Sequence, residues 1–394
     1  MIKLKIKYFL LAEDNPISGV GSVTKKIISQ VSELIRLGLN VELVLLYFGD
    51  IQYGSYDFLT THKLTPVSKR NVIGRIKRTG NINKIFYNTI NELGPHDFLY
   101  YRYTSALPFY YPINYLKKFR NCRVVTEHQA IEINEHKINH AYLGYLCELF
   151  FGGFFKKQSD AIVGVTEEIT RYEIKCSRDL NKPQITIGNG FTIKSVPLKQ
   201  GPSYASLELH LLCVAKYSRW HGIDRLLKGI AGYSGTKKII LHIVGDGSEL
   251  PYLKQLIYEL NIQDHIIFHG FQSGENLDAL FNQCHIAIGS LGIHRIGLKD
   301  ASILKAREYC ARGIPYIIAY NDPDFPNDFP YIFKFPADES PIDIEQVIRF
   351  ASHVCQDNDC PKKMRQYAIE NLDWSIKMKK LKDFFEDISK ENNH

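Results

Sequence analysis

Short apolar runs alternate along this chain with segments whose apolar residues recur at helical spacing. In the first half, apolar runs of strand length cover residues 2–11, 41–47, 97–101, 123–126, 161–165 and 185–187. Between the first two runs, apolar residues recur at helical spacing from Val23 to Ile35, and Gly38 closes the pattern. This strand, helix and strand order predicts a parallel, doubly wound α/β sheet.

The same alternation starts again in the second half. Residues 196–206 contain two prolines and a glycine and follow neither period, and further apolar runs cover residues 211–215, 239–244, 266–269, 286–288 and 316–319. Helical patterns follow Pro341, the last at about 374–388. We therefore expect an N-terminal α/β domain (1–195), a linker (196–206), a second α/β domain (207–370) and a terminal helix (371–394).

The composition is that of a soluble globular protein, with 45% hydrophobic and 23% charged residues among 394. No apolar run reaches the roughly 18 to 20 residues of a membrane-spanning helix. The lysine-rich start reads as a strand and lacks the small-residue cleavage site of a signal peptide, so we expect a cytoplasmic protein. The eight cysteines include no Cys-x-x-Cys pair, which indicates reduced thiols and no zinc site.

Positive charge is concentrated in one stretch of the first half. Between Phe58 and Asn91 there is no acidic residue, while seven cations are interleaved with apolar residues: Lys63, Lys69, Arg70, Arg75, Lys77, Arg78 and Lys84. A basic, partly amphipathic surface suits an anionic membrane face. A solvated basic loop and, after it, nucleic acid are the alternatives, although the aromatic residues are too few for base stacking.

The most informative stretch runs from Asp300 to Pro315. Asp300 and Glu308 lie eight positions apart, and Ser302 is placed to cap a helix from Ile303 to about Arg312 that stops at Gly313. A helix N-terminus presents free N–H groups and positive partial charge, which suits a phosphate. An ordinary strand-loop-helix unit with solvated carboxylates explains the spacing equally well.

Two features of the first half also fall where open α/β sheets bind ligands. The Gly19–Gly21 turn follows the first strand. The pattern Gly-x-x-x-x-Gly-Lys-Ser/Thr is absent there, and Gly-x-Gly-x-x-Gly is also absent because Thr24 stands at the third glycine position. His128 follows a predicted strand at its carboxyl end. A structural role and a role at the site are equally open for this histidine.

Together these segments resemble a glycosyltransferase of the GT-B fold, and most of all family 4 of the retaining nucleotide-sugar enzymes (glycosyl transferases group 1). The resemblance covers nearly the whole chain and is strongest over residues 211–315. It rests on an ordered set of motifs: Val214–Gly222 for the family's Val-Gly-Arg-x4-Lys-Gly loop, Ile243–Gly247 for its Gly-Asp-Gly turn, His269–Phe271 for its x-Gly-x segment, Asp300–Glu308 for its Glu-x7-Glu signature, and Gly19–Gly21, His128, Val165–Glu167 and Asn189–Gly190 in the first half.

The resemblance implies two Rossmann-like domains that face a central cleft, an N-terminal acceptor-binding domain and a C-terminal nucleotide-sugar-binding domain, with the terminal helix packed on the first. It also implies a retaining reaction that needs no metal or other cofactor. It implies that Glu308 binds the ribose, the amides of residues 302–304 hold the diphosphate, and Asp300 binds the sugar. The catalytic residues would be His128, Lys216 and Asp300. The donor-binding residues would be Gly19, Gly21, Lys216, His221, Gly245, Gly270, Phe271, Ser302, Ile303, Leu304, Lys305 and Glu308.

Three residues depart from the family pattern. Asp300 replaces the usual Glu, and Lys216 and His221 replace the usual Arg and Lys. A neutral imidazole is a weaker partner for a diphosphate than a permanent cation. Lys305 or Arg219 would then supply the missing charge. A helical pair of Lys305 with Glu308 is an equally open interpretation.

The resemblance implies transfer of a sugar from a nucleotide-sugar donor to a saccharide acceptor. We expect a polyprenyl-diphosphate-linked acceptor in bacterial capsule or O-antigen synthesis, at the inner face of the cytoplasmic membrane, and no nucleic-acid partner. Because of the three departures, a non-catalytic nucleotide-sugar-binding subunit stays open, as does an epimerase of the same fold. The sequence leaves the base, the sugar and the linkage open.

Overall fold

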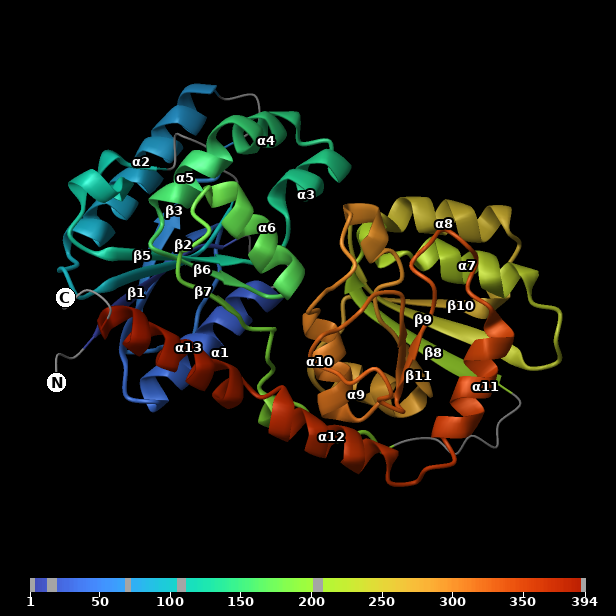
Figure 1. Cartoon of the computed structure of the whole chain (residues 1–394). Coiled ribbons are helices and arrows are strands. Elements are labelled where there is room, and N and C mark those ends of the chain that lie inside the picture. The colour runs from blue at the N-terminus through green and yellow to red at the C-terminus, as the bar shows by residue number, and fades with distance from the viewer. Residues whose placement is uncertain (1–3, 13–19, 68–71, 105–110, 201–207, 391–394) are drawn as a thin grey trace. The chain divides into compact units, whose positions relative to one another are not determined.

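The computed structural model describes residues 4–12, 20–67, 72–104, 111–200 and 208–390. The chain divides into two compact units (Figure 1). The first comprises residues 1–188 and 374–394, and the second comprises residues 189–373. These boundaries differ from the expected ones: residues 196–200 belong to the second unit, where the Lys199 N–H donates to the Arg312 carbonyl (2.7 Å).

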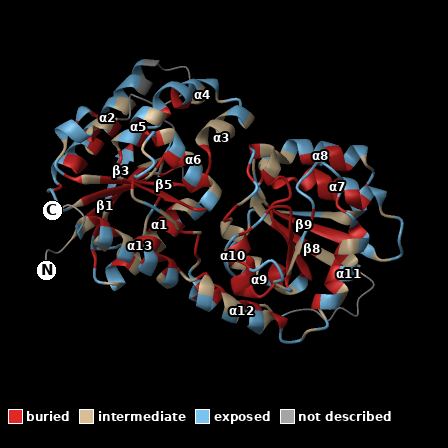
Figure 2. Ribbon diagram, in the orientation of Figure 1, coloured by how far each residue is buried: buried red, intermediate tan, exposed pale blue. Residues whose placement is uncertain are grey.

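The first unit is built on a seven-stranded parallel sheet in the order β3-β2-β1-β4-β5-β6-β7. Its strands are β1 (Lys5–Leu11), β2 (Asn40–Phe48), β3 (Leu59–Leu64), β4 (Phe98–Arg102), β5 (Arg123–His128), β6 (Ala161–Gly164) and β7 (Gln184–Thr186). The central strands are buried (Figure 2), because helices cover both faces of a doubly wound sheet.

The helices of the first unit are α1 (Ser22–Arg36), α2 (Val72–Asn91), α3 (Glu132–Ile138), α4 (Tyr142–Cys147), the π-helical turn η4 (Glu148–Gly152), α5 (Gly153–Gln158), α6 (Glu167–Ser177) and α13 (Trp374–Lys390), with 3₁₀ turns η2 (Ile113–Tyr115) and η3 (Lys117–Phe119). The last helix returns to this unit. Its Phe385 ring lies 5.0 Å from the Phe98 ring of β4, and the Lys382 ammonium donates to the Leu37 carbonyl after α1 (3.0 Å).

The second unit is built on a six-stranded parallel sheet in the order β10-β9-β8-β11-β12-β13. Its strands are β8 (Glu208–Lys216), β9 (Lys238–Asp246), β10 (Ile266–Gly270), β11 (Ile286–Ile288), β12 (Tyr316–Ile318) and β13 (Ile332–Lys334). Its helices are α7 (Ile223–Gly232), α8 (Leu250–Glu259), α9 (Gly274–Gln283), α10 (Leu304–Arg312), α11 (Ile344–Val354) and α12 (Cys360–Asn371), and its short turns are η5 (Ile193–Ser195), η6 (Arg219–His221), η7 (Gln263–His265) and η8 (Ile293–Ile296).

The predicted doubly wound α/β class is confirmed in both units. The edge strands β3 and β13 were not predicted, because their polar and aromatic residues lack a long apolar run. All eight cysteines are free thiols, six of them buried. Among the described residues, no helix is long and apolar enough to cross a membrane, and no group of three His, Cys, Asp or Glu side chains is placed to hold a metal ion.

Candidate functional site

The carboxyl ends of β8 and β11 form the topological switch point of the second sheet. These strands are neighbours, but the chain leaves β8 toward β9 and leaves β11 toward β12. Open α/β sheets bind ligands at such a point. The two loops that follow are joined there, because the Leu291 N–H donates to the His221 carbonyl (2.8 Å).

The start of α10 lies in the loop that follows β11. Ile303 occupies the N-cap position, and no side chain caps the helix. The prediction that Ser302 caps it is wrong: the Ser302 hydroxyl accepts from the Asn189 N–H (2.6 Å), and the Ser302 carbonyl accepts from the Asn189 amide (2.5 Å). The first N–H groups of a helix have no partner within it and carry positive partial charge. The start of α10 is therefore suited to an anion.

Lys305, in the first turn of α10, carries a buried ammonium group. Within the described part of the chain this ammonium has no hydrogen-bond partner, and burial lowers the pKa of Lys305 to about 8. His221 is also buried, and its pKa is lowered well below the usual value, first by burial and then by the charge of Lys305. An uncompensated buried cation is costly. The ammonium and the helix start together provide a site for a phosphate.

Glu308 lies one turn further along α10 and is held by Arg312. The Arg312 guanidinium donates to Glu308 Oε1 (2.8 Å) and to Asp278 Oδ1 of α9 (2.6 Å). The alternative pair of Lys305 with Glu308 is not formed, because the Lys305 ammonium makes no hydrogen bond within the described part of the chain. Glu308 keeps a partly exposed side chain, so one face of it stays available to a ligand.

A buried arginine anchors the start of α10. Arg307 is fully buried and forms a bidentate ion pair with Asp322, and its Nε donates to the Asn189 carbonyl (3.0 Å). Burial opposes the charge of Arg307, but Asp322 and Asp324 outweigh it and raise the pKa. Sequence reasoning missed this group, because the distance between Arg307 and Asp322 along the chain matches no motif.

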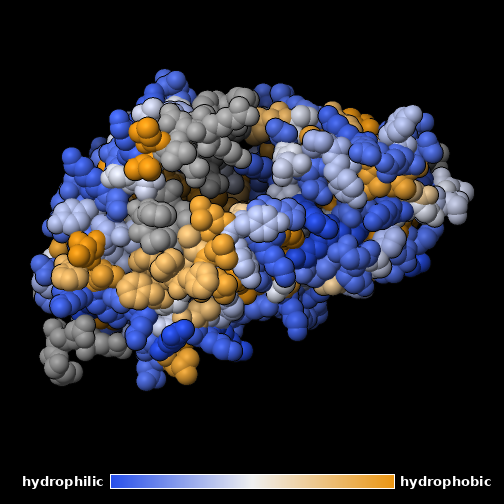
Figure 3. Space-filling model, turned by 90° about the horizontal axis from the view of Figure 1, so that it is seen from above, coloured by the Kyte–Doolittle hydropathy of each residue, from blue (hydrophilic) through white to orange (hydrophobic). Residues whose placement is uncertain are grey.

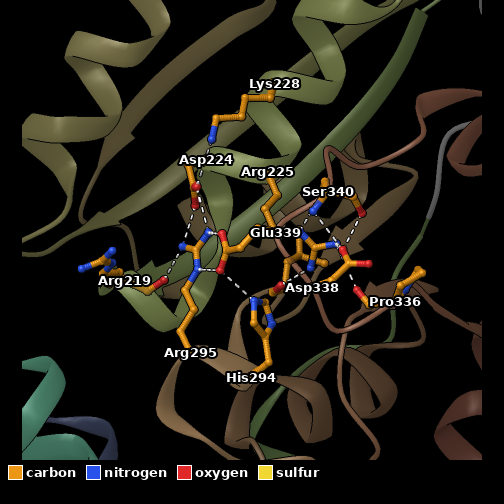
Figure 4. A network of polar contacts seen from close by, with 11 residues as sticks. Arg219, Asp224, Arg225, Lys228, His294, Arg295, Pro336, Asp338, Glu339 and Ser340 are labelled. Carbon is orange, nitrogen blue, oxygen red and sulfur yellow. Dashed lines mark hydrogen bonds and ion pairs between the residues drawn. The ribbon is translucent and has the colours of Figure 1, made fainter.

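Two further arginines, Arg295 and Arg225, join the loops around the switch point (Figure 4). Arg295 of η8 donates two hydrogen bonds to Asp224 at the start of α7 (2.8 and 2.9 Å), and its Nε donates to Glu339 (2.9 Å). Arg225, fully buried, donates to the Ser340 carbonyl (2.8 Å). These contacts hold the loops after β8 and β11 and the loop before α11 in one arrangement.

Other predicted residues of the second unit lie around this point. Lys216 ends β8, is exposed and pairs in register with Asp246. Gly245 has a φ of +115°, and a β-carbon there would lie 2.0 Å from the Ala215 carbonyl oxygen. Gly245 is thus required by the close approach of β9 to β8, whatever the ligand.

Three further predicted residues lie at the end of β10 and in the loop before α10. Gly270 ends the edge strand β10 with a φ of +63° and open space around it, and Phe271 is exposed beside it. Asp300 precedes α10 and accepts a hydrogen bond from the Asn321 amide (2.9 Å). The structure therefore gathers His221, Ser302–Lys305 and Glu308 around the switch point and the start of α10.

The predicted residues of the first unit have different surroundings. Gly19 lies outside the described residues, and Gly21 is the N-cap of α1 with a φ of −69°. His128 is fully buried, lies 2.9 Å from the Thr126 hydroxyl and stacks on Tyr103 with 4.7 Å between the ring centroids. Burial, followed by the charge of Lys156, lowers the pKa of His128, so the ring is neutral. A direct catalytic role for His128 stays a prediction.

Comparisons with known proteins agree with this architecture. Residues 205–324 match the family model for glycosyl transferases group 1. No curated protein sequence matches the chain.

Several solved structures share the fold over nearly the full length. A sucrose-phosphate synthase from Thermosynechococcus elongatus matches with a TM-score of 0.70 and 14% identity over 98% of this chain and 99% of that one. The lipopolysaccharide outer core galactosyltransferase WaaB in its apo form (TM-score 0.64, 16% identity) and Anabaena HepE in complex with UDP (TM-score 0.64, 14% identity) each match over 98% of this chain and 100% of the other. These similarities show the GT-B fold.

Proposed function

Since this chain is a glycosyltransferase of the GT-B fold that carries a glycosyl transferases group 1 domain, we propose that Lys305 and the start of α10 bind the diphosphate of its nucleotide-sugar donor. The observation that carries this proposal is the buried Lys305 ammonium without a hydrogen-bond partner among the described residues, beside a helix start that no side chain caps. A diphosphate supplies the negative charge that this position lacks.

The other donor contacts follow from the same helix. Glu308, partly exposed one turn further along, accepts hydrogen bonds from the ribose hydroxyls, and Asp300, in the preceding loop, binds hydroxyls of the sugar. Lys216 lies exposed at the end of β8 and adds positive charge for the leaving group. Because His221 is neutral, Lys305 takes over the role of the family's second cation.

The transfer we propose retains the configuration at the anomeric carbon. The bond from that carbon to the diphosphate oxygen breaks while the acceptor oxygen forms its bond on the same face. The acceptor proton moves to the leaving phosphate oxygen, so atoms and charges balance without a protein nucleophile. The protein contributes by positioning and by electrostatic stabilisation of the leaving diphosphate. We propose that His128 acts in this step by positioning the end of β5.

Calorimetric titration with UDP tests the donor site, because several similar structures hold UDP. We expect Lys305→Ala to weaken UDP binding by roughly tenfold to a hundredfold, since a charge-assisted phosphate contact contributes about 1.5 to 3 kcal/mol. Lys362→Ala, which changes a well-exposed lysine of α12, is the matched control and leaves the affinity unchanged. Equal affinities of Lys305→Ala and wild type for every nucleotide diphosphate tested, with GDP and CDP beside UDP, would contradict the proposal.

For the acceptor we propose a polyprenyl-diphosphate-linked saccharide of a bacterial surface polysaccharide. WaaB and WaaG, whose structures are similar, are described as lipopolysaccharide enzymes. The basic stretch Lys63–Lys84 supports a membrane location: Lys77 and Lys84 are exposed on α2, while Lys63 is paired with Asp50, and Lys69 and Arg70 lie outside the described residues. Transfer to the lipid-linked saccharide but not to the free saccharide is the expected result. Equal transfer to both would overturn this choice of acceptor.

A further inference from the structure

The helical segment 142–158 of the first unit, formed by α4, η4 and α5, has its apolar residues on the outside. Seven large apolar side chains, each 42% to 71% exposed, form what we call the apolar face: Tyr142, Leu143, Leu146, Leu149, Phe150, Phe151 and Phe154. A surface helix of a globular protein normally turns such residues toward the core. Exposed large apolar side chains that gather in one segment are typical of interaction sites.

The opposite side of the same segment is buried and charged. The Lys156 ammonium lies 2.6 Å from Glu148 and 2.6 Å from Glu173 of α6, and the Tyr103 hydroxyl donates to Glu148 (3.1 Å). Although burial opposes the charge of Lys156, the two carboxylates raise its pKa. Turning the helix over would take Lys156 away from Glu173 and leave that buried carboxylate without its ion pair. The ion pairs therefore hold the apolar face outward.

The one exposed charge within the segment 142–158 is positive. Within residues 142–158, all of which the structure describes, Glu148 is the only carboxylate, and it is buried. Lys157 is exposed at the end of α5. A lipid surface with anionic headgroups complements this charge.

Helix α2 of the same unit also carries exposed apolar and basic residues. Ile73 is 70% and Ile76 67% exposed, next to the exposed Lys77. Aromatic rings connect the two elements: Phe155 of α5 stacks on Tyr111 (4.0 Å between centroids), which in turn contacts Phe86 of α2 (6.5 Å). In Figure 1, α4 and the start of α2 lie at the same end of the first unit, and Figure 3 shows hydrophobic residues gathered on that side.

We propose that the apolar face inserts into one leaflet of an anionic membrane, with the segment 142–158 lying in the plane of the interface. This inference rests on the proposed membrane location but assigns the anchoring to a different element from Lys63–Lys84. An in-plane helix places its apolar residues at the boundary between headgroups and acyl chains. The basic residues of α2 and α5 then contact the lipid phosphates. Insertion and electrostatic attraction together give the two signals that stable anchoring needs.

Flotation with vesicles of phosphatidylethanolamine and phosphatidylglycerol tests the proposal on the full chain. We expect the double variant Leu146→Glu/Phe150→Glu to reduce the bound fraction by about tenfold or more, because two carboxylates then face the acyl chains. Leu180→Glu changes an equally exposed apolar residue of the same unit outside the apolar face, and should bind as wild type does. Unchanged vesicle binding by the double variant would overturn the proposal.

Insertion is distinguished from adsorption by depth. With Trp in place of Phe150, brominated acyl chains should quench the added fluorescence, whereas Leu180→Trp should show no added quenching. A quenching change confined to headgroup-labelled lipid would contradict insertion. Loss of a dimer in light scattering of Leu146→Glu/Phe150→Glu, with vesicle binding intact, would assign the face to a second copy instead.

The same variants separate this inference from the donor proposal. Leu146→Glu/Phe150→Glu should keep wild-type affinity for UDP in solution, and Lys305→Ala should keep wild-type vesicle binding. If Lys305→Ala binds UDP with wild-type affinity while the double variant no longer binds vesicles, the proposed donor site is wrong and the proposed membrane surface is supported. The reverse pattern overturns only the membrane surface.

Discussion

At the scale of single residues, the second unit contains a buried charge, on Lys305, whose position is unfavourable for stability. The Lys305 ammonium is buried without a hydrogen-bond partner among the described residues, while the neighbouring Arg307 and Arg312 are both paired with carboxylates. A buried charge of this kind lowers stability unless a ligand compensates it. Residues that lower stability in this way are typical of functional sites.

We predict that Lys305→Met stabilises the protein without ligand and weakens UDP binding. Because burial lowers the pKa of Lys305 to about 8, removal of the charge should raise the free energy of unfolding by about 1 to 3 kcal/mol. Thermal unfolding with and without UDP measures both effects. A melting temperature below that of wild type without ligand, in a variant that still folds, would show that Lys305 is a structural residue.

At the scale of elements, histidines connect three strands of the second sheet. His269 of β10 and His242 of β9 lie 2.9 Å apart (Nε2 to Nδ1), His242 and His210 of β8 also lie 2.9 Å apart (Nε2 to Nδ1), and His210 Nε2 lies 3.3 Å from Glu208. The Glu208 carboxylate favours a proton on His210 Nε2. Each ring then donates from Nε2 to the next, so the His242 Nδ1 that accepts from His269 carries no proton and the His242 ring is neutral.

We predict that this row makes stability depend on pH. Burial, followed by the charges of His210 and His269, lowers the pKa of His242 to about 4, whereas an unfolded chain has a value near 6.5. Since the unfolded state binds the proton first, the contribution of neutral His242 is complete above about pH 6.5 and decreases as pH falls toward 4. From pH 7.5 to 5 we expect a loss of about 1 to 2 kcal/mol in the free energy of unfolding.

Urea unfolding at both pH values measures this loss. In His242→Gln the difference between the two pH values should become smaller by that amount, while His353→Gln, at an exposed position of α11, should retain the wild-type difference. An identical pH dependence in His242→Gln and wild type would contradict the assignment to the row.

At the scale of the whole molecule, the chain crosses twice between its units. It passes from the first to the second after Gly188 and returns before Trp374, so the first unit is completed only by the last helix. Phe385 of α13 is fully buried against Phe98 and Tyr100, with ring centroids 5.0 and 5.5 Å away. The stability of the first unit therefore depends on residues at the opposite end of the sequence.

We predict that Phe385→Ala destabilises the first unit and leaves the second unchanged. The cavity should cost about 3 to 5 kcal/mol, the usual range for a buried phenylalanine. Calorimetry follows the two units as separate transitions, and only one should shift. Phe271→Ala, at an exposed residue of the second unit, should shift neither by more than about 0.5 kcal/mol. A shift of both transitions in Phe385→Ala would contradict this assignment.

Much of the fold follows from local pattern. Strand and helix periods predicted most strands and the class of both sheets, because a central parallel strand needs an apolar run and a helix needs an apolar stripe. Gly313, expected to end α10, lies in the left-handed region with a φ of +76°. The order of motifs likewise predicted the glycosyl transferases group 1 domain that residues 205–324 match.

The contacts between distant segments could be decided only by the tertiary structure. The local sequence predicted that Ser302 caps α10, but the Ser302 hydroxyl accepts a hydrogen bond from the Asn189 N–H instead. The spacing also allowed an ion pair between Lys305 and Glu308, but Glu308 pairs with Arg312. Residues 142–158 are apolar on almost every side, so their sequence specifies no outward face. The ion pair between Lys156 and Glu173 of α6 determines which side of the segment faces outward. The sequence by itself determined most of the strands and helices, because these depend on neighbours along the chain. The tertiary structure decided which charge stays unpaired and which apolar face stays exposed, because both depend on partners brought together only by folding.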